Sequence, residues 1–232
     1  MKRLFLFAVL LFPAMLQADD SARSLYSSDQ LVQEITNALQ AHFRLQGELD
    51  VDLPRPWTAP EQSAVKWEFG IEEYPGLAGA NMLLRIRLKA DGQVVDNHAL
   101  MVHASLWRDV WVAKLPLRDG TVFSPELLDT RRVDVFVERD ALPTDEGGDS
   151  YVFGRQVAQD RVITWHDITR RPLVHRGQVV DVTGSEGSLS LRMKALAMET
   201  GARGDLVTVR NLESRKDITG IVVGEDQVQV RF

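Results

Sequence analysis

The 232-residue sequence contains no cysteine. Without cysteine there is no disulfide framework, no thiolate-held metal and no acylated cysteine anchor, so the fold depends on packing alone. The histidines lie at His42, His98, His103, His166 and His175. They show no His-Glu-x-x-His or other ligand spacing, and His98 and His103 fall on opposite faces of a regular strand. We therefore predict no metal and no cofactor; a zinc site built from distant histidines is the less favoured alternative.

Catalytic motifs are also scarce. Neither Gly-x-Ser-x-Gly nor a phosphate loop occurs, because the glycine pair Gly184 and Gly187 is not followed by Lys-Ser/Thr. Ser63 and Lys66 match the Ser-x-x-Lys motif of penicillin-recognising enzymes, but the partner Ser-Asp-Asn and Lys-Thr-Gly motifs are missing. The sequence therefore favours a protein that is not an enzyme.

Basic residues are outnumbered. The chain has 27 Lys and Arg against 33 Asp and Glu, a formal net charge of −6. Removal of Lys2 and Arg3 with a leader would leave 25 basic residues against 33 acidic ones, a formal charge of −8. Binding to a nucleic acid backbone needs a basic surface, so we predict no nucleic acid partner.

There is one long hydrophobic run, from Leu4 to Leu16. It follows Lys2 and Arg3 and ends at Ala18, a pattern typical of a cleavable secretory signal peptide. The run contains Pro13 and is shorter than the roughly 20 residues that a membrane-spanning helix needs. We therefore predict a signal peptide at residues 1–18 and no integral membrane anchor after its cleavage; an uncleaved anchor is the alternative.

Residues 19–112 are predicted to form an α+β domain. Leu31, Ile35, Leu39 and Phe43 recur every fourth residue, which predicts a helix from about Asp29 to Phe43 with Ser28 as its cap. Short alternating or apolar runs at 49–53, 65–69, 83–88 and 100–113 predict strands, and residues 90–92 predict a hairpin turn. The expected structure is a helix packed on a curved antiparallel sheet.

Four tryptophans fall in this region: Trp57, Trp67, Trp107 and Trp111. Large aromatic side chains dominate burial, so we interpret them as core or domain-seam residues. Binding of sugar or peptidoglycan is the alternative interpretation.

Residues 113–172 contain a duplication. Residues 119–127 align over 160–168 with an offset of 41, and a pair of arginines follows each copy. Ser124 and Thr164 are each placed to cap a short helical turn. Residues 138–150 lie between the copies and are predicted to form a solvated, mobile loop, because their carboxylates lack the spacing of a calcium loop.

Residues 173–232 read as short strands separated by turns. Leu206, Val207 and Val209 precede a turn at Arg210-Asn211, and Val228 alternates with polar residues near the end. This pattern predicts a small closed β-barrel.

The last segment also carries a resemblance. It reads Gly201-x-x-Gly204-Asp205-x-Val207-x-Val209-Arg210-Asn211-x-x-Ser214-x-Lys216, with Gly220 closing it and Val174-His175-Arg176-Gly177-Gln178-Val179-Val180 before it. This succession resembles the C-terminal signature of the flagellar basal-body P-ring formation protein family, which are periplasmic assembly chaperones. The duplicated segment is similar to a SAF (β-clip) domain, with Gly120 at the expected glycine and Arg161 in its place in the second copy.

The expected fold class is therefore α+β, mostly β: an N-terminal helix on an antiparallel sheet at 19–112, a SAF-like domain at 113–172 and a small barrel at 173–232. The resemblance implies a periplasmic chaperone that binds the P-ring subunit and prevents its premature self-association. A peptidoglycan- or carbohydrate-binding module and a pilus-assembly SAF component are the alternatives. The expected partner-binding residues are Phe123, Trp165, Val207, Val209, Arg210 and Asn211; the competing interpretation makes all six core or turn residues.

Overall fold

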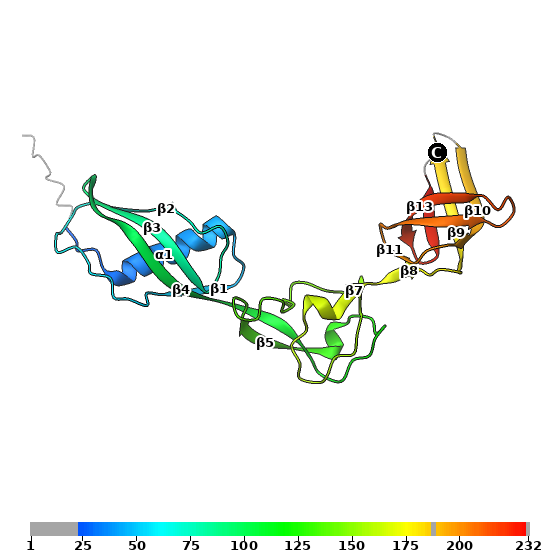
Figure 1. The fold of residues 1–232 in the computed structure, drawn as a ribbon, viewed down its shortest axis with the longest axis horizontal. Helices are drawn as coiled ribbons and strands as arrows, with labels where there is room; N and C mark the ends of the chain where they lie inside the picture. Colours follow the sequence, from blue (N-terminus) through cyan, green and yellow to red (C-terminus); the bar gives the residue numbers. More distant parts are fainter. Residues whose placement is uncertain (1–22, 187–188, 231–232) are drawn as a thin grey trace, which may run out of the picture. The chain divides into compact units, whose positions relative to one another are not determined.

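The computed structural model describes residues 23–186 and 189–230, so the predicted signal peptide lies outside the described residues. The described residues divide into two compact units, one formed by residues 23–45 and 51–104 and the other by 46–50, 105–186 and 189–230. Among the described residues no helix is long and apolar enough to cross a membrane. Figure 1 shows the helix α1 near the start of the described chain and strands along most of the rest, which confirms the mostly β fold class.

The first described elements are a helix and a sheet, and two strands of the sheet have residues in both units. The elements are α1 (Ser28–Phe43), β1 (Glu48–Asp52), β2 (Trp67–Glu73), β3 (Asn81–Ala90) and β4 (Gln93–Ala113), and the sheet order is β1-β4-β3-β2. Alternate residues of β3 are buried, and α1 buries Leu31, Ile35 and Leu39. The predicted fourth-residue spacing thus marks the buried side of the helix.

The cap of α1 is Ser27, one residue earlier than predicted. The Ser27 hydroxyl accepts a hydrogen bond from the Gln30 backbone N–H at 3.1 Å, and the Gln30 side chain accepts one from the Ser27 N–H at 2.9 Å. This reciprocal pair is a capping box, which satisfies two backbone donors. Ser28 is therefore the first residue of the helix and not its cap. Gln30 follows Ser27 after three residues and returns the hydrogen bond, and no such residue follows Ser28.

The hairpin between β3 and β4 forms at the predicted residues. Asp91 and Gly92 have φ of 48° and 84°, and Lys89 and Ala90 pair with Val94 and Gln93. Two consecutive positive φ values belong to the tight turns that match the twist of a hairpin.

The second unit begins with a module built on two similar halves. Its elements are η1 (Pro125–Leu127), β5 (Leu128–Asp134), β6 (Tyr151–Phe153), η2 (Trp165–Asp167) and β7 (Ile168–Arg170). The amides and carbonyls of Leu117 and Val157 bond to each other at 2.9 and 3.0 Å, so the two halves face one another. The two copies are therefore related by a pseudo-twofold axis, the symmetry that a duplicated sequence predicts.

The predicted offset of 41 is wrong by one residue. The Lys114 amide bonds to the Leu127 carbonyl at 3.1 Å, and the Gly154 amide bonds to the Asp167 carbonyl at 2.9 Å, which fixes an offset of 40. Asp160, rather than Arg161, is then the counterpart of Gly120. Aligning the two copies by residue type therefore did not pair Gly120 with Asp160, the two residues that share a positive φ.

The prediction of a solvated, mobile loop at residues 138–150 is also wrong in part. Leu142 is fully buried in the core of the module, and its amide and carbonyl bond to the Ile163 carbonyl and the Trp111 amide at 2.8 and 3.0 Å. Gly147 packs against the ring of Phe123. Polar composition alone did not reveal these two anchoring points.

The chain ends in a closed five-stranded barrel, as predicted. Its strands are β9 (Val179–Glu186), β10 (Leu189–Ala197), β12 (Leu206–Asn211), β13 (Asp217–Gly224) and β14 (Gln227–Val230), in the order β10-β12-β13-β14-β9. The parallel pairing of β14 with β9 closes it. The short strands β8 (Pro172–Val174) and β11 (Gly201–Ala202) pair with each other. Seven valines and two alanines of these barrel strands, with Val174, make up the buried core.

Candidate partner-binding surface

Strand β12 presents two different faces. Val207 and Val209 are 1% and 0% exposed and belong to the barrel core. Successive residues of a strand point to opposite sides, so Leu206, Thr208 and Arg210 lie on the outside. The predicted set of signature residues therefore combines core residues with outward ones.

The outward residues of β12 pair directly with those of β13. The register places Leu206 opposite Ile221, Thr208 opposite Thr219 and Arg210 opposite Asp217. Leu206 is 68% exposed, and Ile221 and Val223 continue the apolar side chains along β13. We call the residues Leu206, Thr208, Arg210, Asp217, Thr219, Ile221 and Val223 the outer β12–β13 face.

The polar end of this face is an ion pair. The Arg210 guanidinium donates through Nε to Asp217 Oδ1 at 2.7 Å and through a terminal nitrogen to Oδ2 at 2.9 Å. These hydrogen bonds from Arg210 lower the pKa of the Asp217 carboxyl below its ordinary value. The two-point contact fixes the guanidinium plane beside the apolar residues.

Asn211 is a turn residue. Its side-chain oxygen accepts hydrogen bonds from the Glu213 and Ser214 amides at 2.7 and 3.0 Å, and its amide nitrogen lies 3.1 Å from Met193 sulfur. These contacts stabilise the turn between β12 and β13. This arrangement agrees with the turn interpretation of Asn211.

Phe123 and Trp165 differ in exposure. Phe123 is 2% exposed, stacks on Phe153 with ring centres 5.7 Å apart and meets Trp111 edge-on at 6.0 Å. Trp165 opens η2 and is 42% exposed. Phe123, like Val207 and Val209, has almost no surface to offer a partner, whereas Trp165 and Arg210 do.

Leu206 is the exposed residue that sequence reasoning overlooked. The signal was available, because strict alternation puts Leu206 and Arg210 on one face and the two valines on the other. The sequence alone did not show which face lies inside the barrel, although the valines favour the inside.

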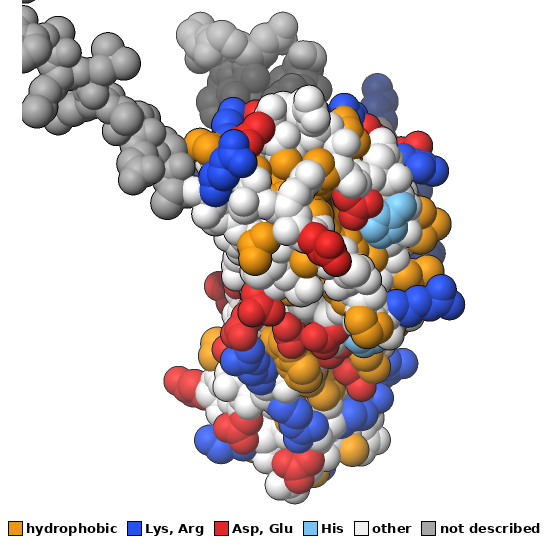
Figure 2. Space-filling model, turned by 90° about the vertical axis from the view of Figure 1, so that its left-hand side faces the viewer, with side chains coloured by type: hydrophobic (Ala, Val, Ile, Leu, Met, Phe, Trp, Pro, Cys, Tyr) orange, Lys and Arg blue, Asp and Glu red, His pale blue; other side chains and the backbone are white. Residues whose placement is uncertain are grey.

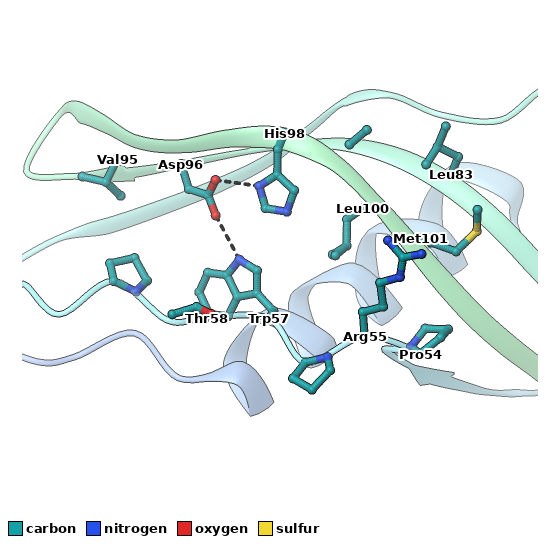
Figure 3. Close-up of a pocket in the computed structure, with 13 residues that line it drawn as sticks. Pro54, Arg55, Trp57, Thr58, Leu83, Val95, Asp96, His98, Leu100 and Met101 are labelled. Carbon is teal, nitrogen blue, oxygen red and sulfur yellow. Dashed lines mark hydrogen bonds and ion pairs between the residues drawn. The ribbon is translucent and has the colours of Figure 1, made fainter.

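The first unit carries a groove of about 790 Å³. It lies between the segment around Pro54 and Trp57 and the paired residues Leu83 and Met101, which are 56% and 47% exposed. Asp96 lies between two polar partners at one end (Figure 3): it accepts from the Trp57 indole at 2.9 Å and bonds to His98 Nδ1 at 2.6 Å. The groove is mostly apolar, and at one end Asp96 is held by its hydrogen bonds to Trp57 and His98.

The tryptophans of the predicted α+β domain all have structural contacts. Trp57 is 9% exposed, Trp67 donates to the Ser24 carbonyl at 2.9 Å, and Trp111 donates to the Glu146 carbonyl at 3.0 Å. The Trp107 ring lies beneath the Arg132 guanidinium, 5.9 Å from its centre. These contacts favour the packing interpretation over sugar binding.

Apolar side chains also reach the surface elsewhere. Figure 2 shows several orange groups on the face it draws, among white, acidic and basic side chains. Among residues 23–186 and 189–230, no group of three or more potential ligands is arranged to hold a metal ion.

One helix on an antiparallel sheet, followed by small β modules, defines a modular, mostly β protein. Residues 108–230 match the family model for the chaperone for flagella basal body P-ring formation. The match covers more than half of the chain, so the chain belongs to this family. The family membership suggested by the residues at 174–180 and 201–220 is therefore confirmed.

Known relatives agree with this assignment. The chain is 23% identical over 123 residues to the flagella basal body P-ring formation protein FlgA of Aquifex aeolicus (strain VF5), covering 52% of this chain and 55% of that protein. It thus spans about half the length of the curated relative it matches.

Two solved structures share the fold. Salmonella FlgA in its open form has a TM-score of 0.64 and 18% identity, covering 87% of this chain and 93% of the other. The flagellar protein FlgA from Thermotoga maritima MSB8 has a TM-score of 0.55 and 18% identity, covering 86% and 71%. At these identities the likeness concerns the fold.

Proposed function

We propose that this protein is a periplasmic chaperone that binds P-ring subunits and prevents their premature self-association until the ring forms. The family match supports a role in P-ring formation. The periplasmic location rests on the export pattern of residues 1–18, which precede the described part of the chain. The subunit is the partner, and no chemical step is part of the role.

The observation that carries the binding proposal is the apolar row on the outer β12–β13 face, in which Leu206 is exposed and Ile221 and Val223 are half-buried. Leu206, Ile221 and Val223 are neighbours on the outside of a barrel whose core is already complete without them. They are not among the residues of that core cluster, and contiguous apolar surface residues rimmed by polar ones mark protein contact sites. Arg210 and Asp217 supply that rim at one end.

The barrel favours contact through side chains. Among the described residues its strands close into a ring through β14 and β9, so most of their backbone groups are already paired and are not available to a partner strand. The apolar row would cover the surface through which a P-ring subunit contacts the next subunit. When a neighbouring subunit binds to that surface, it would displace the chaperone. We propose Trp165 as a second, aromatic anchor, since exposed tryptophans often dominate interface energies.

The test is capture of purified P-ring subunit by the full chain, together with light scattering of the subunit alone and with the chaperone. Leu206→Lys is expected to reduce both capture and suppression of self-association. The protein should stay folded, because Leu206 is 68% exposed. Val137→Lys is the matched control, since Val137 is 70% exposed and lies outside the barrel.

Retention of full capture and suppression by a Leu206→Lys, Ile221→Lys double variant would exclude this face. Sedimentation with purified sacculi, run beside the capture assay, tests the peptidoglycan alternative. Binding to sacculi without subunit capture would replace the chaperone proposal with a wall-binding function.

A further inference from the structure

Asp167 is the one fully buried charged residue among those that the structure describes. Its Oδ2 accepts hydrogen bonds from the backbone and hydroxyl of Thr164, both at 2.8 Å. Its Oδ1 accepts from Arg155 Nε at 2.6 Å and from a terminal nitrogen of Arg161. Two guanidinium groups therefore converge on a single carboxylate oxygen.

The charges of this cluster do not balance. Arg155 and Arg161 bring two positive charges, and Asp167 brings one negative charge. Neither arginine has a second acidic partner among the described residues. Their side chains are 51% and 43% exposed, so most of their hydrogen-bond donors remain available to solvent. The result is a fixed pair of cations with one uncompensated charge at the surface.

The first half of the same module provides an internal comparison. With the offset of 40, Leu115, Thr121 and Leu127 occupy the positions of Arg155, Arg161 and Asp167. Leu127 packs against the apolar core of the module. The fold thus closes in one half without any charge at these three positions.

The charged cluster is therefore not a requirement of the fold. Buried ion pairs are often no more stabilising than apolar residues of similar size, because both charges must lose their water. Placing two guanidinium groups side by side adds repulsion between like charges. A stability role alone would favour the neutral set that the first half already uses.

We propose that Arg155 and Arg161 form a binding site for a small oxyanion, the carboxylate or phosphate group of a ligand, with Asp167 as the positioning residue. Guanidinium groups match the geometry of such anions through paired hydrogen bonds. Asp167 holds the two groups in place before the anion arrives, which lowers the conformational cost of binding. The anion supplies the missing negative charge.

The experiment is an NMR titration of the arginine Nε–H signals in the full chain at constant ionic strength. Sodium phosphate and sodium acetate are added in separate arms against sodium chloride, which separates a phosphate from a carboxylate preference. Saturable shifts of the Arg155 and Arg161 signals are expected in at least one arm. Arg155→Gln should weaken binding about tenfold or more. Arg176→Gln, an exposed arginine outside the cluster, should leave it unchanged.

A second variant separates binding from structure. Arg155→Leu, Arg161→Thr and Asp167→Leu together reproduce the neutral set of the first half, so this triple variant is expected to fold with a thermal midpoint near that of the parent and to lose anion binding. If the triple variant does not fold, the single variants Arg155→Gln and Arg161→Gln test the site instead. Each of them keeps one arginine bonded to Asp167, so the buried carboxylate is not left without a cationic partner. Linear, unsaturable shifts in both arms, or binding unchanged in these variants, would overturn the site.

Discussion

Gly120 and Asp160 share a left-handed backbone conformation, with φ of 78° and 61°, at equivalent points of the two halves of the middle module. The Gly120 amide donates to the Phe153 carbonyl and the Asp160 amide to the Ala113 carbonyl, both at 2.8 Å. Aspartate tolerates this conformation better than most residues, which explains why it replaces glycine there. The alignment by residue type matched Asp119 with Asp160 and so shifted the register by one.

Gly120→Ala is therefore expected to lower the free energy of unfolding by about 1 to 2 kcal/mol, because a Cβ is strained at positive φ. The measurement is urea unfolding of the full chain. Gly76→Ala is the control, since an added Cβ there meets nothing within 4 Å and its φ lies outside the positive region. Equal losses of unfolding free energy in the two variants would contradict the requirement for a positive φ at Gly120.

The position of the helix cap gives a second prediction. Ser27→Ala should lower the free energy of unfolding by about 1 kcal/mol, because it leaves the Gln30 amide without its side-chain acceptor. Ser28→Ala should change it by less than about 0.5 kcal/mol, as exposed substitutions usually do. Thermal or urea unfolding of both variants distinguishes the two candidate caps. A larger loss of stability from Ser28→Ala than from Ser27→Ala would mean that Ser28 is the cap.

A third prediction concerns the tightest point of the barrel. A Cβ on Gly220 would lie 2.4 Å from Val228 Cγ1 and 2.9 Å from the Gln229 carbonyl oxygen. Gly220→Ala should therefore cost about 1 to 3 kcal/mol, the usual range for overpacking. Gly70→Ala, also in a strand but with open space around its Cβ, is the control and should be close to neutral. Near-equal unfolding midpoints for the two variants would count against close packing at Gly220.

Periodicity predicted the elements better than it predicted the surface. Fourth-residue spacing located α1, and alternation located the barrel strands, because burial of one face leaves a regular pattern in the sequence. The same alternation separates Val209 from Arg210, so a partner-binding set that includes both cannot lie on one face. A place in a sequence motif does not determine on which face of a strand a residue lies.

Long-range contacts escaped prediction for a different reason. Leu142 and Gly147 lie in a polar stretch; the partner of Leu142, Ile163, lies 21 residues later and the partner of Gly147, Phe123, lies 24 residues earlier. Asp167 gave no local sign that two arginines would meet on it, because their convergence depends on how the second half of the module folds back. Such sites become visible only when the tertiary contacts are known.

The buried carboxylate gives the last prediction, on pH dependence. Burial raises the pKa of Asp167, but the hydrogen bonds from Thr164 and then those from Arg155 and Arg161 outweigh it, so the pKa lies below its ordinary value. A carboxyl whose pKa falls on folding stabilises the protein above its unfolded pKa of about 3.9, and this contribution is lost as the pH falls through the folded pKa.

Asp167→Asn should therefore be less stable than the parent by about 1 to 3 kcal/mol at pH 7, with a gap that narrows as the pH falls toward 3. Urea unfolding at both pH values measures the gap. Asp129→Asn is the control, since Asp129 is exposed and should give a small difference at either pH. A gap of the same size at pH 3 and pH 7 would mean that the Asn variant loses packing or capping rather than the charge on Asp167.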